Sequence, residues 1–104
     1  MDVMLAKMQE QARLKALRVT QHAQEEMDAE DITLREVREA IAKGQVLENY
    51  PEHLRGPCCL LYGQTEEGFP LHIVCTTAQP LLIIITVYKP TLPKWVSPTR
   101  RRDV

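Results

Sequence analysis

A chain of 104 residues supports one domain with one core, and a formal net charge of −1 at pH 7 is not that of a strongly basic nucleic-acid binder. Its three cysteines are an odd number and make no disulfide framework, so we expect a protein of the reducing cytoplasm. No apolar stretch approaches the roughly 20 residues that a membrane span needs. Charged residues also interrupt the N-terminus where a signal peptide would have its apolar region.

The charge is unevenly distributed along the chain. Residues 1–42 carry six basic and nine acidic side chains, whereas residues 43–104 carry seven basic and five acidic ones. If the protein contacts a phosphate backbone, we therefore expect the contact in the second part of the chain.

The first predicted element is an amphipathic helix over residues 2–17. Its apolar residues recur at helical spacing and are Met4, Leu5, Met8, Ala12 and Leu17. Burying this stripe stabilises the protein by about 25 cal/mol per Å² of apolar surface removed from water. We expect the helix to pack on the domain's own sheet, where it would block an open face, or against a second copy of the chain in a homodimer.

Two further helices have clear capping signals. Thr20 is placed to cap a helix that continues to about Glu30. Thr33 and Glu36 form a capping box at the start of the next helix. Gly44 is placed to end that helix in a left-handed conformation.

The chain then changes to strand periodicity. Runs rich in β-branched and aromatic residues predict four antiparallel strands, at residues 46–50, 58–63, 69–76 and 82–89. The last of these is apolar on both faces, which is typical of an internal strand. We expect an α+β fold in which N-terminal helices pack on one face of a four-stranded antiparallel sheet, followed by a loose tail at residues 96–104.

Polar side chains near the end of the predicted sheet are candidates for chemistry. His72 lies between Leu71 and Ile73, so strand alternation turns it away from the helices and onto the open face. Thr86 and Tyr88 share one face of the last strand. The structural alternative is that these side chains only fill a half-buried sheet surface.

Two candidates lie outside the sheet. His22 is one helical turn before Glu25 and Glu26, and nearby carboxylates favour the imidazolium form of a general acid. Arg55 lies beside Gly56 in a loop and is free to bind a phosphate bidentately. The alternative for both is an ordinary solvated side chain.

Metal binding is disfavoured, although Cys58, Cys59, His72 and Cys75 lie on neighbouring strands, where we expect Cys58 opposite Cys75. His72 and Cys75 point to opposite faces, and the spacing of a zinc knuckle is missing. Buried cysteines acting as small hydrophobes are the favoured interpretation, and we expect no metal and no cofactor. The sole serine, Ser97, lies in a proline-rich tail and does not indicate a serine hydrolase.

Short segments over most of the chain combine into one pattern. In the first half they are Thr20-x-His22-Ala23-x-x-x-Met27, Ile32-Thr33 and Val37-x-x-Ala40-Ile41-x-x-Gly44-x-Val46-x-Glu48-x-Tyr50. In the second half they are Arg55-Gly56, Leu61, Gly63, Gly68-x-Pro70-Leu71-His72-Ile73-Val74, Ile85-Thr86-Val87-Tyr88-x-Pro90 and Trp95. The combination, over residues 18–95, resembles the domain-of-unknown-function family 4258. Residues 1–17 then form an extra helix, and residues 96–104 a basic tail.

That family is similar to the small toxins of the RelE superfamily, including MqsR-like toxins. The resemblance implies a RelE-like fold, ribonuclease activity and a bacterial toxin–antitoxin module whose antitoxin is of the zinc-finger type. It places six residues on the family's recurring polar and aromatic positions: His22, Arg55, His72, Thr86, Tyr88 and Trp95. The chain departs from the pattern at Glu26 and Glu30, where the family usually has basic residues, and this removes phosphate contacts.

Two functional hypotheses follow. The first is a metal-independent, mRNA interferase-like endoribonuclease. Its catalytic residues would be His22, His72 and Tyr88, and its RNA-binding residues Arg55, Thr86, Lys89 and Trp95. The second is a non-catalytic protein-interaction module of the same fold, binding a cognate antitoxin or itself, which the acidic N-terminal part favours.

Overall fold

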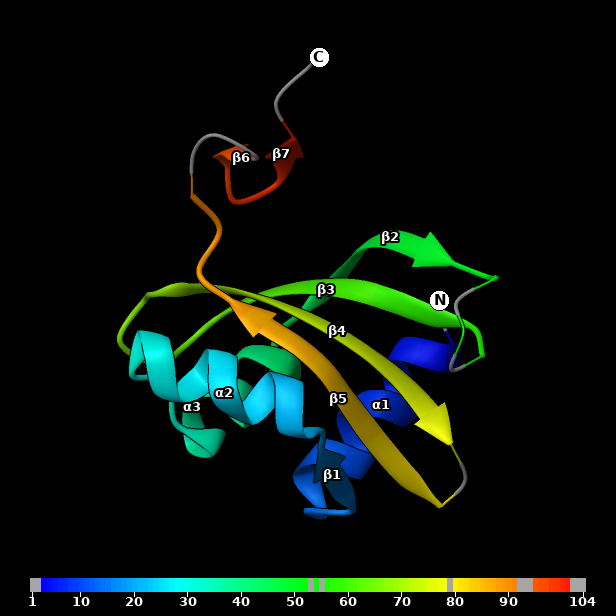
Figure 1. The fold of residues 1–104 in the computed structure, drawn as a ribbon. Coiled ribbons are helices and arrows are strands. Elements are labelled where there is room, and N and C mark those ends of the chain that lie inside the picture. The colour runs from blue at the N-terminus through cyan, green and yellow to red at the C-terminus, as the bar shows by residue number, and fades with distance from the viewer. Residues whose placement is uncertain (1–2, 53, 55, 79, 92–94, 102–104) are drawn as a thin grey trace.

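The structure, a computed structural model, describes residues 3–52, 54, 56–78, 80–91 and 95–101. Its described elements are α1 (Val3–Arg13), β1 (Leu17–Val19), α2 (Gln21–Glu30), α3 (Leu34–Ala42), β2 (Gln45–Tyr50), β3 (Cys58–Gln64), β4 (Pro70–Ala78), β5 (Leu81–Tyr88), β6 (Trp95–Ser97) and β7 (Arg100–Arg101). Figure 1 shows the three helices on one side of the main sheet and the β6–β7 hairpin on the other side. Among the described helices, none is long and apolar enough to cross a membrane.

The main sheet confirms the α+β class but has one strand more than expected. Its strands lie in the order β1-β5-β4-β3-β2, and β2 to β5 form the predicted antiparallel meander. The prediction of a four-stranded antiparallel sheet is wrong, because Leu17–Val19 adds β1 as a parallel neighbour of β5. β5 is therefore an internal strand, as its two apolar faces predict.

The extra strand exists because α1 ends at Arg13 instead of residue 17. Lys15 adopts a left-handed conformation with φ 60° and donates from its backbone N–H to the Ala12 carbonyl at 3.2 Å. The next N–H, of Ala16, donates to the Gln11 carbonyl at 2.8 Å. These two bonds make a Schellman motif, which normally has glycine at the left-handed position. A lysine there conceals the end of the helix from sequence-based prediction.

The caps of α2 and α3 are those predicted. The Thr20 hydroxyl accepts a hydrogen bond from the Ala23 backbone N–H at 3.1 Å. Thr33 and Glu36 form a complete capping box, in which each side chain accepts from the other residue's backbone N–H.

Close packing of α3 on β3 requires glycine at Gly63 and leaves little room for a side chain at Gly44. Gly44 does not take the left-handed conformation that we expect, since its φ is not positive, and the C-cap of α3 is Lys43 with φ −116°. Instead, a Cβ atom at Gly44 would lie 3.0 Å from the Ala40 carbonyl oxygen. At Gly63 the same distance would be 1.8 Å, so only glycine fits this contact between helix and strand.

The helix α1 belongs to the core of its own chain. Met8 and Ala12 are each only 2% exposed, and the Met8 sulfur lies 3.6 Å from the Cys59 sulfur and 3.8 Å from the Cys75 sulfur. Packing on the domain's own sheet is thus confirmed. The expected block of the opposite face is wrong, because α1 lies on the side of the other helices (Figure 1).

The cysteines pair differently from the expected register. Cys59, not Cys58, lies opposite Cys75, because β3 and β4 pair with Gln64 opposite Pro70. The contact with Cys59 and burial both raise the pKa of the Cys75 thiol. All three cysteines are buried, and the described residues contain no group of histidines, cysteines and carboxylates that could hold a metal ion.

Candidate functional site

His72 occupies the predicted face of β4, but that face is covered. Leu71 and Ile73 point into the core below the sheet, so His72 points away from the helices. Its side chain is nevertheless fully buried, because the Trp95 ring packs edge-on against it with 4.2 Å between the ring centroids. The expectation of an open face is therefore wrong, and the cover is the β6–β7 hairpin.

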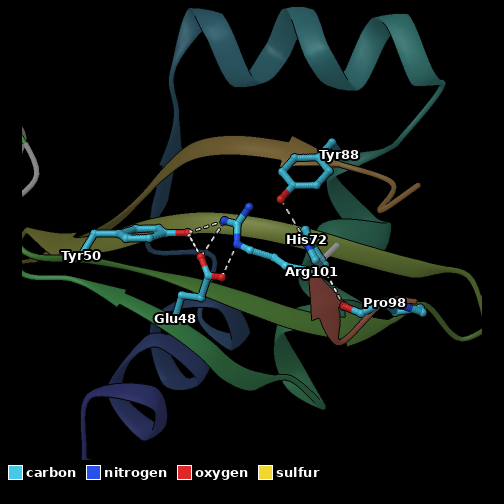
Figure 2. Close-up of polar contacts among 6 residues, drawn as sticks. All are labelled: Glu48, Tyr50, His72, Tyr88, Pro98 and Arg101. Atoms are coloured by element: carbon cyan, nitrogen blue, oxygen red, sulfur yellow. Dashed lines mark hydrogen bonds and ion pairs between the residues drawn. The ribbon is translucent and has the colours of Figure 1, made fainter. Parts of the chain in front are cut away.

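Both nitrogens of the His72 ring have partners (Figure 2). Nε2 lies against the Pro98 carbonyl oxygen, and Nδ1 lies 3.1 Å from the Tyr88 hydroxyl. A carbonyl oxygen can only accept, so Nε2 carries a proton, and in the neutral imidazole Nδ1 accepts from Tyr88. Burial raises the pKa of Tyr88, so its hydroxyl keeps the proton that this bond requires.

A second group of polar contacts joins β2 to β7. The Glu48 carboxylate accepts hydrogen bonds from the Tyr50 hydroxyl and from the Arg101 guanidinium, whose Nη2 lies 2.7 Å from Oε1. Burial and the adjacent Glu48 raise the pKa of Tyr50 to about 12. Glu48 likewise raises the pKa of Arg101, so the guanidinium stays charged beside a neutral phenol.

Arg101 connects the two groups. Its guanidinium carbon lies 4.6 Å from the centre of the Trp95 ring, which in turn contacts His72. Figure 2 shows the guanidinium between the Glu48–Tyr50 pair and the His72–Tyr88 pair. We call this set the sheet-face cluster; its residues are Glu48, Tyr50, His72, Tyr88, Trp95 and Arg101. The expected loose tail at residues 96–104 is wrong for its described part, because residues 96–101 contribute to β6 and β7, the Pro98 carbonyl contacts His72, and Arg101 belongs to this cluster.

The sheet-face cluster combines groups that can move protons and stabilise negative charge. It holds an imidazole with a proton on Nε2, a carboxylate, a guanidinium and two neutral phenols. In this conformation, however, His72 Nε2 donates its hydrogen bond to the Pro98 carbonyl, and the charge of the Arg101 guanidinium is paired with the Glu48 carboxylate. A substrate can reach the imidazole only if the hairpin moves.

The other predicted site residues are not brought into this cluster. The His22 side chain is 66% exposed on α2, in the helical layer, with its Nε2 at 3.4 Å from a Glu26 oxygen. Lys89 is exposed, and its Nζ lies 5.9 Å from the centre of the Phe69 ring. Thr86 is half-buried and pairs with Val74 on β4. Arg55 lies outside the described residues.

The acidic residues Glu26 and Glu30 have a structural role. The paired part of β1 ends opposite Ile84, and beyond this point no strand of the described chain pairs with the outer edge of β5. The Glu26 carboxylate accepts from the Val87 backbone N–H at 3.0 Å, and Glu30 accepts from the Lys89 N–H at 3.3 Å. The two carboxylates accept the hydrogen bonds that the carbonyl groups of a neighbouring strand would otherwise accept. They thereby hinder pairing of this edge with a strand of another molecule.

Sequence reasoning missed three members of the cluster. Glu48 and Tyr50 are two residues apart on a predicted strand, a spacing that indicates a shared face. That signal was available, but nothing in the strand pattern shows what they bind. Arg101 has no such signal, because its position depends on how a short segment folds back onto the sheet.

Comparison with known proteins identifies a family. No curated protein and no solved structure matches the chain. A family model matches residues 19–89, which leaves out α1 and the β6–β7 hairpin even though both contribute buried residues. Because this match spans more than half of the chain, the protein belongs to the family described as Domain of unknown function (DUF4258).

Proposed function

We propose that this protein is a metal-independent endoribonuclease that uses the sheet-face cluster, as the toxin of a bacterial toxin–antitoxin module. The observation that carries the proposal is the presence of His72, Glu48 and Arg101 in one connected cluster on one face of the sheet. Cleavage of RNA without a metal needs a base for the 2′-hydroxyl, an acid for the leaving 5′-oxygen and a cation for the phosphorane. The three residues supply one group of each kind.

The roles follow from the contacts. Glu48 takes the proton of the 2′-hydroxyl while the 2′-oxygen forms a bond to phosphorus. The bond from phosphorus to the 5′-oxygen breaks, and the imidazolium form of His72, with a proton on each nitrogen, gives that oxygen the proton of Nε2 and keeps the proton of Nδ1. Arg101 stabilises the charge on the phosphorane, and the products are a 2′,3′-cyclic phosphate and a 5′-hydroxyl. Tyr88 can keep its hydrogen bond to His72 Nδ1 whether or not that nitrogen carries a proton. Its hydroxyl donates to Nδ1 when Nδ1 is unprotonated and accepts from Nδ1–H when it is protonated.

The proposal keeps part of the RNA-binding set expected from the sequence. Thr86 lies on the same sheet face as Tyr88 and can contact a phosphate at the rim of the cluster, where the exposed Lys89 adds a positive charge. His22 takes no part, because it lies on α2 in the helical layer. The partner in the module is a cognate antitoxin of the zinc-finger type, which the resemblance to the RelE superfamily supports.

Incubation of the purified protein with single-stranded RNA, with and without EDTA, tests the proposal. We expect cleavage that EDTA leaves unchanged, with cyclic phosphate ends. His72→Gln and Glu48→Gln should each lower the rate by about 100-fold or more. The matched control is His22→Gln, which changes an exposed histidine and should keep the wild-type rate. No cleavage by the wild type, or equal rates in the histidine variants, would refute the proposed function.

A second candidate is a non-catalytic interaction module that binds an antitoxin or a second copy. The observation that favours it is that the cluster is satisfied internally, with His72 fully buried and Arg101 paired with Glu48. This candidate predicts no RNA cleavage by any form of the protein. It also predicts that the His72→Gln variant binds the cognate antitoxin as tightly as the wild type in isothermal titration calorimetry.

A further inference from the structure

Among the residues that the structure describes, the β6–β7 hairpin contacts the main sheet through side chains and the Pro98 carbonyl, not through a strand ladder. It forms its own two-stranded sheet, in which Trp95 lies opposite Arg101 and Ser97 lies opposite Arg100. An isolated two-stranded hairpin is marginally stable in water. Its position therefore depends on its contacts with the sheet-face cluster.

Each of these contacts occupies a group that the proposed reaction needs. The Pro98 carbonyl accepts from His72 Nε2 at the position where a leaving oxygen would receive its proton. Trp95 covers the imidazole, and Glu48 holds the Arg101 cation that a phosphate would otherwise attract. RNA and the docked hairpin therefore exclude each other at His72.

The contacts that hold the β6–β7 hairpin on the main sheet are individually weak. A hydrogen bond from Trp95 lowers the pKa of the neighbouring Tyr88, against the larger effect of burial, but the buried indole N–H lies outside normal hydrogen-bond geometry. A buried donor with so poor a bond gains little from docking, because in water it would be fully solvated. The Arg101–Glu48 pair is partly exposed, with side-chain exposures of 38% and 26%, and such pairs contribute little. Opening of the hairpin should therefore need less free energy than unfolding of the sheet.

We propose that the β6–β7 hairpin is an autoinhibitory plug. Docked, it closes the sheet-face cluster. Undocked, it admits RNA to His72 and releases Arg101 from Glu48, so that the guanidinium pairs with the phosphate of the bound RNA and Glu48 is free to act as the base. The effect on cleavage rests on the proposed function, whereas the opening of the hairpin does not.

Hydrogen exchange on the full chain tests the opening. We expect the backbone amides of Ser97 and Arg101 to exchange at least about tenfold faster than those of Ile73 and Val74 in the wild type. Trp95→Ala should raise exchange in the hairpin further while the β4 amides keep their wild-type rates. If Trp95→Ala accelerates exchange in β4 and the hairpin equally, the hairpin is part of the cooperative core and the proposal is overturned.

Chemical modification and cleavage test the consequence. Diethyl pyrocarbonate modifies accessible imidazoles, and the exposed His22 is an internal standard read by peptide mass spectrometry. Relative to His22, modification of His72 should be slow in the wild type and at least about tenfold faster in Trp95→Ala. RNA cleavage should rise in parallel. Met4→Ala, which changes an exposed side chain on α1 in the helical layer, is the control and should stay close to the wild type in both assays.

The outcomes separate the two proposals. Unchanged modification of His72 in Trp95→Ala overturns the plug. Faster modification with slower cleavage also overturns it, since Trp95 would then be a substrate contact. Faster modification with no cleavage by any form supports the plug as a cover and refutes the proposed ribonuclease.

Discussion

Replacing Met8 with alanine should destabilise the whole domain, although Met8 lies outside the segment that defines the family. Its side chain is 2% exposed and fills the space between α1 and the thiols of Cys59 and Cys75. Removing a fully buried methionine side chain costs the lost burial plus a cavity, about 2–5 kcal/mol. Because α1 is an outer helix that can settle partly onto the sheet, we expect about 3 kcal/mol. For a domain of this size that loss lowers Tm by roughly 12–24 °C.

The matched control is Met4→Ala on the same helix. Met4 is 47% exposed, so its loss should change the free energy of unfolding by less than about 0.5 kcal/mol. Urea unfolding and thermal melts at several protein concentrations measure both variants. Because the contact is within one chain, the loss for Met8→Ala should not depend on concentration. Equal effects of the two variants, or a Tm that falls on dilution, would refute intrachain packing of α1.

Three further predictions concern the sheet and its edge. Glu26→Ala leaves the Val87 N–H without its acceptor, so it should lower the free energy of unfolding in urea by about 1–3 kcal/mol and speed hydrogen exchange at Val87. Unchanged exchange at Val87 would contradict the role of Glu26 as the acceptor at this edge. Gly63→Ala places a Cβ atom 1.8 Å from the Ala40 carbonyl oxygen, so it should destabilise the domain by about 3 kcal/mol or more; a wild-type Tm would contradict this close contact. The pKa of Tyr50 is raised from 10.0 to about 12 by folding, so its stabilising contribution is complete below pH 10 and is lost as the pH rises through 12. Tyr50→Phe should weaken this alkaline loss in melts between pH 9 and about 12.

The differences between the predicted and the observed fold have local physical causes. The capping box at Thr33 and Glu36 depends on neighbours in the chain, and it forms as predicted. The end of α1 also depends on neighbours, but Lys15 takes a conformation for which glycine is the usual signal. Periodicity therefore overextends this helix and hides β1. That strand depends on tertiary contacts: it pairs with β5, a segment far along the chain, and Leu17 and Val19 pack against the core.

In the candidate site, too, features set by neighbours in the chain differ from features set by distant segments. Alternation of side chains along a strand is a property of the backbone, so the sequence by itself determines that His72 faces away from Leu71, Ile73 and the helices. It does not determine whether that face is open. Arg101 and Glu48 are separated by 53 positions, and the hairpin that joins them is too short for a periodic pattern. Only the tertiary structure decides that His72 is buried, because the cover depends on contacts between distant side chains, to which local propensity contributes nothing.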